Sequence, residues 1–334
     1  STPFKFDHVG SFLRPESLKK ARRDYEAGSI TAEELKSVED EAITELIKKE
    51  KEFGLHAITD GEFRRATWHL DFMWAFDGVG HSKTETGLPF HGEAAMIDDT
   101  YLTGKIVYKT HPFIEHFKFV QQFEDEDTVA KLTIPAPAQF LEQMIMPFAW
   151  GNTKKFYDTP EQVAEDIANG YKEFIKDVYA AGCRNLQFDD CSWGMVVDPS
   201  ACKFFGTTPA GLEKIKNTLL DINNKSIEGK PEDLVINTHV CRGNFHSTYA
   251  NSGAYDPVAD ILFGEENVNA YYLEFDDERS GGFAPLAKVS GDKKVVLGLI
   301  TTKSPVLENK DQVIARIHEA EQYIPLDRLY LSPQ

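Results

Sequence analysis

The sequence predicts a (β/α)8 barrel, an α/β fold in which eight parallel strands alternate with helices. Short apolar runs alternate with amphipathic helical stretches along nearly all of the 334 residues. Eight such runs can be counted, which is the number that closes a barrel of this kind. The length suits either one barrel or two ordinary domains, and we expect one catalytic domain over residues 1–334.

The expected strands are rich in Val, Ile, Leu and aromatic residues, and polar residues follow each of them. In chain order they cover residues 6–12, 56–63, 130–140, 184–193, 234–244, 269–277, 294–303 and 328–334. A doubly wound open sheet is the alternative, because strand closure cannot be read from a sequence.

Two of the connecting helices have clear ends. The first, over residues 31–54, opens with Thr31 and Glu34 at capping-box spacing and stops at Gly54. The second, over residues 159–182, has a proline in its first turn and a glycine just past its end. Residues 81–128 fit neither strand nor helix of a barrel, and they predict a β-rich insertion after the second strand.

Composition excludes several kinds of partner. The formal charge is −18, from 54 acidic against 36 basic residues, which argues against nucleic acid and an anionic membrane surface. No apolar run is long enough to span a bilayer and the N-terminus does not resemble a signal peptide, so we expect a cytoplasmic protein. Four cysteines are too few for a disulfide scaffold, and we expect thiolate chemistry from them rather than cystine.

The candidate site residues follow the expected strands. Active sites of such barrels lie at the carboxyl ends of the strands, so residues far apart in sequence would meet at one rim. The polar residues at these positions are His8, Ser11, Asp60, Glu62, Asp189, Asp190, Cys191, His239, Cys241, Glu274, Asp276 and Lys303.

His239 and Cys241 are the most informative pair. Alternate residues of a strand share a face, so the imidazole and the thiolate could bind one ion, and Glu274 would supply a third ligand of the kind zinc prefers. A His-x-Cys pair alone is weak, since buried cysteine usually behaves as a small apolar residue. By the same caution Glu62, Asp189 and Asp190 could be helix caps or ion pairs, and the cysteines at 183, 191 and 202 are interpreted as structural.

Six motifs together resemble the cobalamin-independent methionine synthases. They are HVGSFLRP (8–15), ITDGEFRR (58–65), LQFDD (186–190), THVCRGN (238–244), YLEFD (272–276) and LSPQ (331–334). The sequence is most similar to the short bacterial relatives, single barrels of the superfamily that includes uroporphyrinogen decarboxylase. The resemblance spans residues 6–334 and implies a barrel with a catalytic zinc that transfers a methyl group to the sulfur of homocysteine.

The resemblance also assigns roles. It implies that His239, Cys241 and Glu274 bind the zinc, and that Ser11, Glu62 and Asp189 hold the amino-acid ends of the substrate; we also expect His8 in the substrate site. Zinc would convert the substrate thiol to the thiolate, which is the nucleophile, at neutral pH. The carboxylates would pair with the substrate's ammonium group and orient it. Asp189 and Lys303 are the expected catalytic residues.

The sequence also departs from that family. Lys303 stands where the larger synthases have a histidine after the seventh strand, which makes Lys303 the candidate proton donor. A second barrel and the tryptophan that stacks on folate are missing, so the methyl donor, methylfolate or a corrinoid, stays open. In the family a zinc-binding cysteine follows LSPQ at once, and we expect the natural chain to continue past Gln334 with that cysteine and a C-terminal helix.

Three other functions remain open. A decarboxylase acting on a tetrapyrrole would need basic residues for its many carboxylates, and this rim is acidic. A zinc-dependent alkyl transferase for another small thiol would not need the carboxylates Glu62 and Asp189. A non-catalytic zinc-binding barrel would explain Lys303 and the missing folate apparatus.

Overall fold

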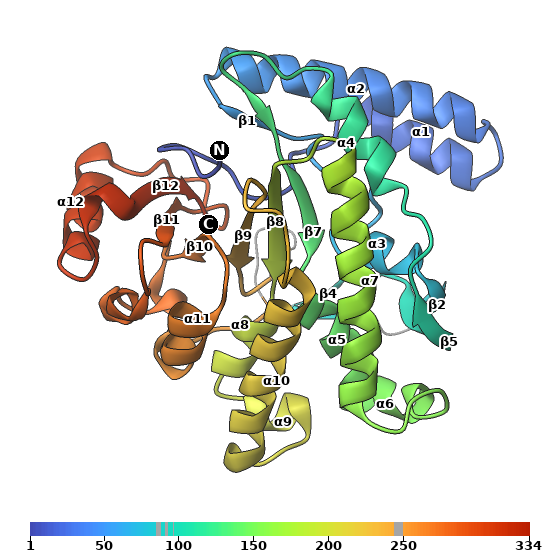
Figure 1. The fold of residues 1–334 in the computed structure, drawn as a ribbon. Helices are drawn as coiled ribbons and strands as arrows, with labels where there is room; N and C mark the ends of the chain where they lie inside the picture. Colours follow the sequence, from blue (N-terminus) through green and yellow to red (C-terminus); the bar gives the residue numbers. More distant parts are fainter. Residues whose placement is uncertain (85–87, 91–92, 96, 244–249) are drawn as a thin grey trace.

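The centre of the structure is a six-stranded parallel sheet with strand order β12-β11-β10-β9-β8-β7 (Figure 1). The computed structural model describes residues 1–84, 88–90, 93–95, 97–243 and 250–334. The strands of the sheet are β7 (Leu132–Pro135), β8 (Asn185–Asp190), β9 (Val235–Val240), β10 (Ala270–Glu274), β11 (Lys294–Ile300) and β12 (Leu329–Pro333).

Parallel pairing continues beyond both edges of the sheet. At one edge Phe6 forms a parallel bridge with Leu331, and Asp7 N donates to Leu331 O at 2.9 Å. At the other, β6 (Val129–Ala130) directly precedes β7 and pairs in parallel with β1 (Ala57–Ile58). Each of the predicted runs therefore contributes a strand or a bridge, and the neighbours follow one another in the order a barrel requires.

Closure of the barrel is not established by these pairings. The strand-like segment at residues 5–7 meets β1 through a side chain, with His8 Nε2 2.8 Å from Ala57 O. Past both segments, Phe12 N donates to Gly61 O at 3.2 Å. Within the described part of the chain no backbone ladder joins the two segments, so the observed architecture is a mixed α/β fold and closure stays a prediction.

The two helices with predicted ends are observed. Helix α2 (Ala32–Glu52) begins with the predicted capping box between Thr31 and Glu34. Helix α7 (Pro160–Ala180) has Thr159 as its side-chain cap and ends before Gly182, whose φ of 106° suits glycine. The other helices are α1 (Glu16–Glu26), α3 (Leu70–Trp74), α4 (Phe113–Gln121), α5 (Pro137–Ile145), α6 (Pro147–Thr153), α8 (Ser192–Val197), α9 (Ala201–Phe205), α10 (Pro209–Ile227), α11 (Ala259–Glu265) and α12 (Lys310–Glu321).

The segment predicted as a β-rich insertion contains two small antiparallel sheets. Strand β2 (Asp77–Ser82) pairs with β5 (Asp99–Val107), and β3 (Leu88–Phe90) pairs with β4 (Glu93–Ala95). The same segment also holds α4, which the sequence pattern did not separate from the strands. Residues 85–87, 91–92 and 96 of the prediction lie outside the described residues.

Two predicted strands end earlier than expected, and helices replace their ends. The run 130–140 stops being a strand at Pro135, because Pro137 occupies the first turn of α5. The run 184–193 stops at Asp190, after which α8 begins. Both strands therefore end at the carboxyl edge of the sheet, where helices α5 and α8 follow them.

Helices α7 and α10 pack side by side against the β7–β9 part of the sheet (Figure 1). Tyr171 of α7 donates from its hydroxyl to Pro135 O at 2.6 Å, and Asn223 of α10 donates to Asp190 at 3.1 Å. All six residues of β8 are buried, as expected for a parallel strand covered on both faces.

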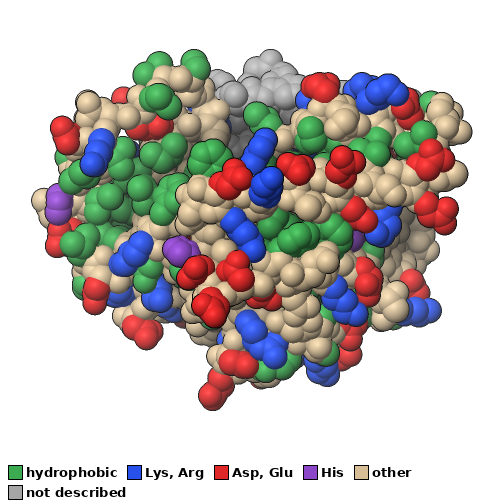
Figure 2. Space-filling model, turned by 90° about the horizontal axis from the view of Figure 1, so that it is seen from above, with side chains coloured by type: hydrophobic (Ala, Val, Ile, Leu, Met, Phe, Trp, Pro, Cys, Tyr) green, Lys and Arg blue, Asp and Glu red, His purple; other side chains and the backbone are tan. Residues whose placement is uncertain are grey.

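Over the face shown in Figure 2, acidic and basic side chains are mixed, with apolar groups between them. Among the described residues, no helix combines the length and the apolar character needed to cross a bilayer.

Candidate functional site

A small cavity of about 110 Å³ opens at the carboxyl ends of β8 and β9, beside the loop that follows β1. It gathers residues from four distant parts of the sequence: Gly10, Ser11, Glu62, Trp68, Asp189, Cys191, His239, Cys241 and Gly243. Six of the predicted rim residues (Ser11, Glu62, Asp189, Cys191, His239 and Cys241) therefore share one cavity.

The register of the sheet explains this gathering. His239 of β9 is paired with Asp189 of β8 and with Tyr272 of β10. Cys191, Cys241 and Glu274 each come two positions after one of these three residues in the sequence. Glu274 is the last residue of β10, whereas Cys191 and Cys241 directly follow β8 and β9, where Cys241 N donates to Asp190 O at 3.4 Å.

Glu62 is held in an unusual backbone conformation. Its φ is 63°, in the left-handed region that residues other than glycine rarely adopt. Glu62 N donates to Asp60 Oδ1 at 2.8 Å, and Arg14 Nη2 donates to Glu62 O at 2.8 Å. Strain of this kind persists where the surroundings hold it, and it is concentrated at functional sites.

The Glu62 carboxyl group is buried, and burial raises its pKa to about 6. The nearby Arg65 lowers this pKa, while the negative charge of Asp189 raises it further. Glu62 Oε1 accepts from Thr133 Oγ1 at 3.0 Å and lies 3.5 Å from Arg65 Nη1. The site therefore contains two close carboxylates that a cationic group would stabilise.

Asp189 fixes the ring of His239. His239 Nδ1 lies 3.2 Å from Asp189 Oδ1, and Gln187 Nε2 donates to the same oxygen at 2.7 Å. His239 Nε2 has no hydrogen-bond partner among the described groups, although the residue is only 6% exposed. A carboxylate on one ring nitrogen and a bare second nitrogen is the arrangement that metal-binding histidines adopt.

Cys191 and Cys241 are joined as a disulfide, with their Cα atoms 5.1 Å apart. For these two cysteines this corrects the expectation of thiolate rather than cystine; Cys241 is the predicted zinc ligand, and both residues line the cavity. No local sequence pattern indicates this pair, because the two cysteines are 50 residues apart and the parallel pairing of β8 and β9 brings them together. Cys183 and Cys202 are free cysteines.

Glu274, the third predicted metal ligand, is adjacent to the cavity but does not line it. Its Oε1 accepts from Arg242 N at 2.6 Å and lies 3.6 Å from Arg242 Nη1, and the residue is fully buried. Among the residues that the structure describes, no group of three His, Cys, Asp or Glu side chains has metal-binding geometry.

Two further predicted residues lie outside the cavity. His8 contacts Ala57 O, and burial together with Lys131 lowers the pKa of its imidazole to about 4, so the ring is neutral at pH 7. Lys303 follows β11, which β10 separates from β9, and its backbone N donates to Thr301 Oγ1 at 3.0 Å. Neither side chain lines the cavity as the structure stands.

Sequence reasoning missed some of the lining. Trp68 lines the cavity and stacks on His69 with ring centroids 4.2 Å apart. Gly10 and Gly243 were not singled out, although both stand inside quoted motifs. The sequence feature that could have indicated these two glycines is their position beside polar residues predicted for the rim.

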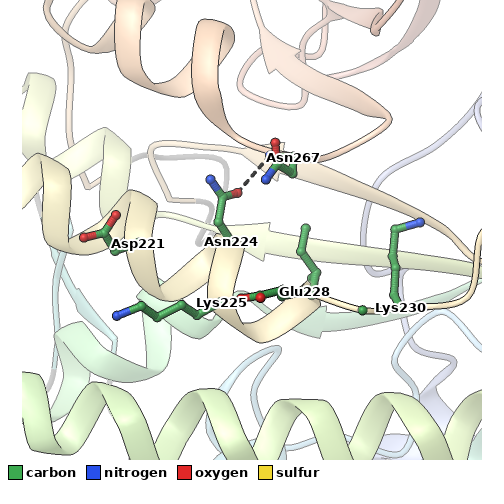
Figure 3. Close-up of a pocket in the computed structure, with 8 residues that line it drawn as sticks. Asp221, Asn224, Lys225, Glu228, Lys230 and Asn267 are labelled. Carbon is green, nitrogen blue, oxygen red and sulfur yellow. Dashed lines mark hydrogen bonds between the residues drawn. The ribbon is translucent and has the colours of Figure 1, made fainter.

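A larger cavity of about 420 Å³ lies elsewhere (Figure 3). Its lining comes from the end of α10 and from residues that precede β9 and β10, including Lys230 and Asn267. Asn267 N donates to Asn224 Oδ1 at 2.8 Å across it. Residues at the amino ends of parallel strands typically serve stability, so size does not decide which cavity is functional.

Residues 5–334 match the family described as "Cobalamin-independent synthase, Catalytic domain". The chain belongs to this family. It is 40% identical over 338 residues to the uncharacterized protein YxjG of Bacillus subtilis, covering 99% of this chain and 86% of that one. It is 23% identical to a methionine synthase of Saccharolobus solfataricus, over 97% of this chain and 85% of the relative.

Solved structures agree with this assignment. A putative vitamin-B12-independent methionine synthase from Listeria monocytogenes has a TM-score of 0.79 and 39% identity, covering 99% of this chain and 91% of its own. A B12-independent methionine synthase from Shewanella sp. W3-18-1, in complex with selenomethionine, has a TM-score of 0.73 over 98% of this chain and 89% of its own. At 17% identity, the latter shows the shared fold alone.

Proposed function

We propose that this protein is a zinc-dependent methyltransferase that transfers a methyl group to the thiol of homocysteine and so forms methionine. The observation that carries the proposal is the bare Nε2 of His239 beside Cys241, in a cavity that Glu62 and Asp189 also line. Family membership supports the same chemistry. The proposal includes a closed barrel, in which all the strand ends would surround one site.

The residues of the chain fit a zinc ion in part. His239 offers a free nitrogen whose orientation Asp189 fixes, and Cys241 offers a sulfur once it is reduced. Glu274 lies one strand away, and its Oε1 accepts a hydrogen bond from the backbone N–H of Arg242. A zinc ion bound there supplies a Lewis acid that keeps the substrate sulfur deprotonated at neutral pH.

The remaining lining suits an α-amino acid. Glu62 and Asp189 can pair with an ammonium group, and Ser11 can donate a hydrogen bond to a carboxylate. A substrate held at both ends is oriented for transfer, which lowers the entropic part of the barrier.

The Shewanella neighbour adds support because it binds selenomethionine, an analogue of the proposed product. A site that holds the product's amino and carboxyl groups would hold those of homocysteine equally. For the methyl donor we propose a corrinoid or another small carrier, with monoglutamyl methylfolate used poorly.

The test is a methyl-transfer assay of the reduced, zinc-loaded protein with homocysteine and a panel of donors, in which methionine is measured by mass spectrometry. Coenzyme M and a simple alkyl thiol serve as alternative acceptors. We expect methionine to form, and we expect methyl transfer to the alternative thiols to be far slower. Equal transfer to a thiol without an ammonium group would contradict the substrate assignment.

Lys303 is tested in the same assay. If it protonates or stabilises the departing carrier, Lys303→Ala slows transfer more than it weakens homocysteine binding, because the effect belongs to the transition state. Efficient turnover of methylfolate at a rate unaffected by Lys303→Ala would refute both the donor and the role of the lysine.

A further inference from the structure

We propose that Cys191 is an additional metal ligand of this site, which binds the same ion as Cys241 when both cysteines are reduced. The inference rests on the proposed zinc site and extends its ligand set by one residue. It is drawn from three observations: the register of three strands, the direct bond between the two sulfur atoms, and the bare nitrogen of His239.

The register places the donors at one level. Asp189, His239 and Tyr272 form a row across β8, β9 and β10, and Cys191, Cys241 and Glu274 stand two positions beyond them. Neighbouring parallel strands lie about 4.8 Å apart, so donors on adjacent strands at one level can reach a common ion. Four candidate donors, His239 included, therefore lie within three consecutive strand ends.

The two cysteines are close enough to share an ion. Their Cα atoms are 5.1 Å apart and their sulfur atoms meet, so Cys191 reaches any position that Cys241 can reach. Both side chains line the cavity, as does His239, whose buried Nε2 has no partner among the described groups. Zinc binds thiolate and imidazole together in its commonest protein sites.

Cys191 is better placed than Glu274 for this role. The Glu274 carboxylate is fully buried and accepts from Arg242 N at 2.6 Å, whereas Cys191 is partly exposed at the cavity. Together with His239 and Cys241, Cys191 would give the ion three protein ligands of the kinds that zinc prefers.

The disulfide is the metal-free, oxidised form of the same pair. A dithiol reductant splits the S–S bond: each cysteine gains one electron and one proton, and the reductant is oxidised to its own disulfide. Metal binding then displaces the two thiol protons, because thiolate is the ligand. Oxidised protein is therefore expected to bind no stoichiometric zinc.

The experiment compares reduced wild type with Cys191→Ser, Cys241→Ser and Cys202→Ser. Cys202 is the matched control, because it is a free cysteine that does not line the cavity. Zinc affinity is measured by competition with a chromophoric chelator. Thiolate ligands are counted from the sulfur-to-metal charge-transfer absorption of the cobalt(II)-substituted protein. Circular dichroism verifies that each variant is folded.

For Cys191→Ser we expect zinc affinity to fall by roughly tenfold or more, a loss that even outer-sphere partners of a metal can cause. The cobalt band should lose one thiolate's share of intensity, and Cys202→Ser should leave both quantities unchanged. Zinc should also protect Cys191 from alkylation by iodoacetamide in the wild type. A Cys191→Ser protein with wild-type affinity and cobalt spectrum overturns this inference, while a Cys241→Ser protein that still binds zinc overturns the proposed function itself.

Discussion

Two neighbouring aspartates of β8 have opposite surroundings. Asp189 faces the cavity and holds the ring of His239. Asp190 points to the helix side, where its carboxylate accepts from Ser192 N, Ser192 Oγ and Asn223 Nδ2 at 3.0, 2.5 and 3.1 Å. The alternation of side chains along a strand is the whole cause of this difference.

The helix side of β8 holds a cluster of buried acidic residues, one of which, Glu142, also lines a cavity of about 430 Å³. Asn223 joins Asp190 to Glu266 with a second bond of 2.7 Å, and Glu142 lies close enough for Asp190 to affect it. Burial raises the pKa of Glu142 and of Glu266 to about 8, and the charge of Asp190 adds to both increases. Carboxyl burial alone therefore does not identify a functional site, and the proposed site rests instead on the bare His239 nitrogen beside Cys241.

The largest expected effect belongs to the cavity side. His239→Ala and Cys241→Ala should abolish stoichiometric zinc binding and methyl transfer, because each removes a proposed ligand. Secondary structure should survive, since the site lies on the rim and not in the core. Zinc is measured by atomic emission on protein reduced beforehand, and folding by circular dichroism. Equal zinc content in wild type and variants would defeat the metal assignment.

A second effect separates the cavity aspartate from its neighbour. Asp189→Asn and Glu62→Gln should each weaken homocysteine binding more than tenfold, since losing a charged partner of an ammonium costs roughly 1.5 to 3 kcal/mol in a closed site. Isothermal titration of the zinc protein should also show that binding releases about one proton, as the thiol of homocysteine becomes a thiolate. Wild-type affinity in both variants would place the ammonium group elsewhere.

Most of the fold, but only part of the site, could be predicted from the sequence. The strand runs and the helix starts at Thr31 and Pro160 depend on local patterns, and the structure confirms them. The pairing of Cys191 with Cys241 depends on the register of two strands 50 residues apart, which no local pattern records. The hydrogen bond from Arg242 N to Glu274 joins residues 32 positions apart, so no local pattern predicts it either.

The helix side should show a stability effect without a binding effect. Asp190→Ala removes the acceptor of three buried hydrogen bonds, so the free energy of unfolding should fall by about 1 to 3 kcal/mol. Homocysteine affinity should change less than twofold, because Asp190 does not line the cavity. Urea unfolding and titration of the same preparation measure the two quantities. If Asp190→Ala lost more free energy of homocysteine binding than of unfolding, the division between the two faces of β8 would be contradicted.

The smallest expected effect is a change in how stability depends on pH. Glu142 is buried, its Oε2 has no hydrogen-bond partner among the described groups, and burial raises its pKa to about 8 from an ordinary 4.5. Between these values the folded protein holds a proton that the unfolded chain has released. Glu142 therefore contributes fully to stability below pH 4.5, and this contribution is lost as pH rises through 8.

Glu142→Gln removes the titrating group but keeps the shape, so the variant should lose less stability than the wild type between pH 5 and pH 8. The difference in the free energy of unfolding between Glu142→Gln and the wild type should grow by at most about 1 kcal/mol per pH unit. One pKa unit corresponds to about 1.4 kcal/mol, and Asp190 shares part of the titration. Urea unfolding at pH 5, 6, 7 and 8 measures it, with Glu165→Gln on the exposed side of α7 as the control. Parallel stability curves for wild type and Glu142→Gln would show that this carboxyl group is ionised in the folded protein, and the contrast between the two faces of β8 would then rest on hydrogen bonding alone.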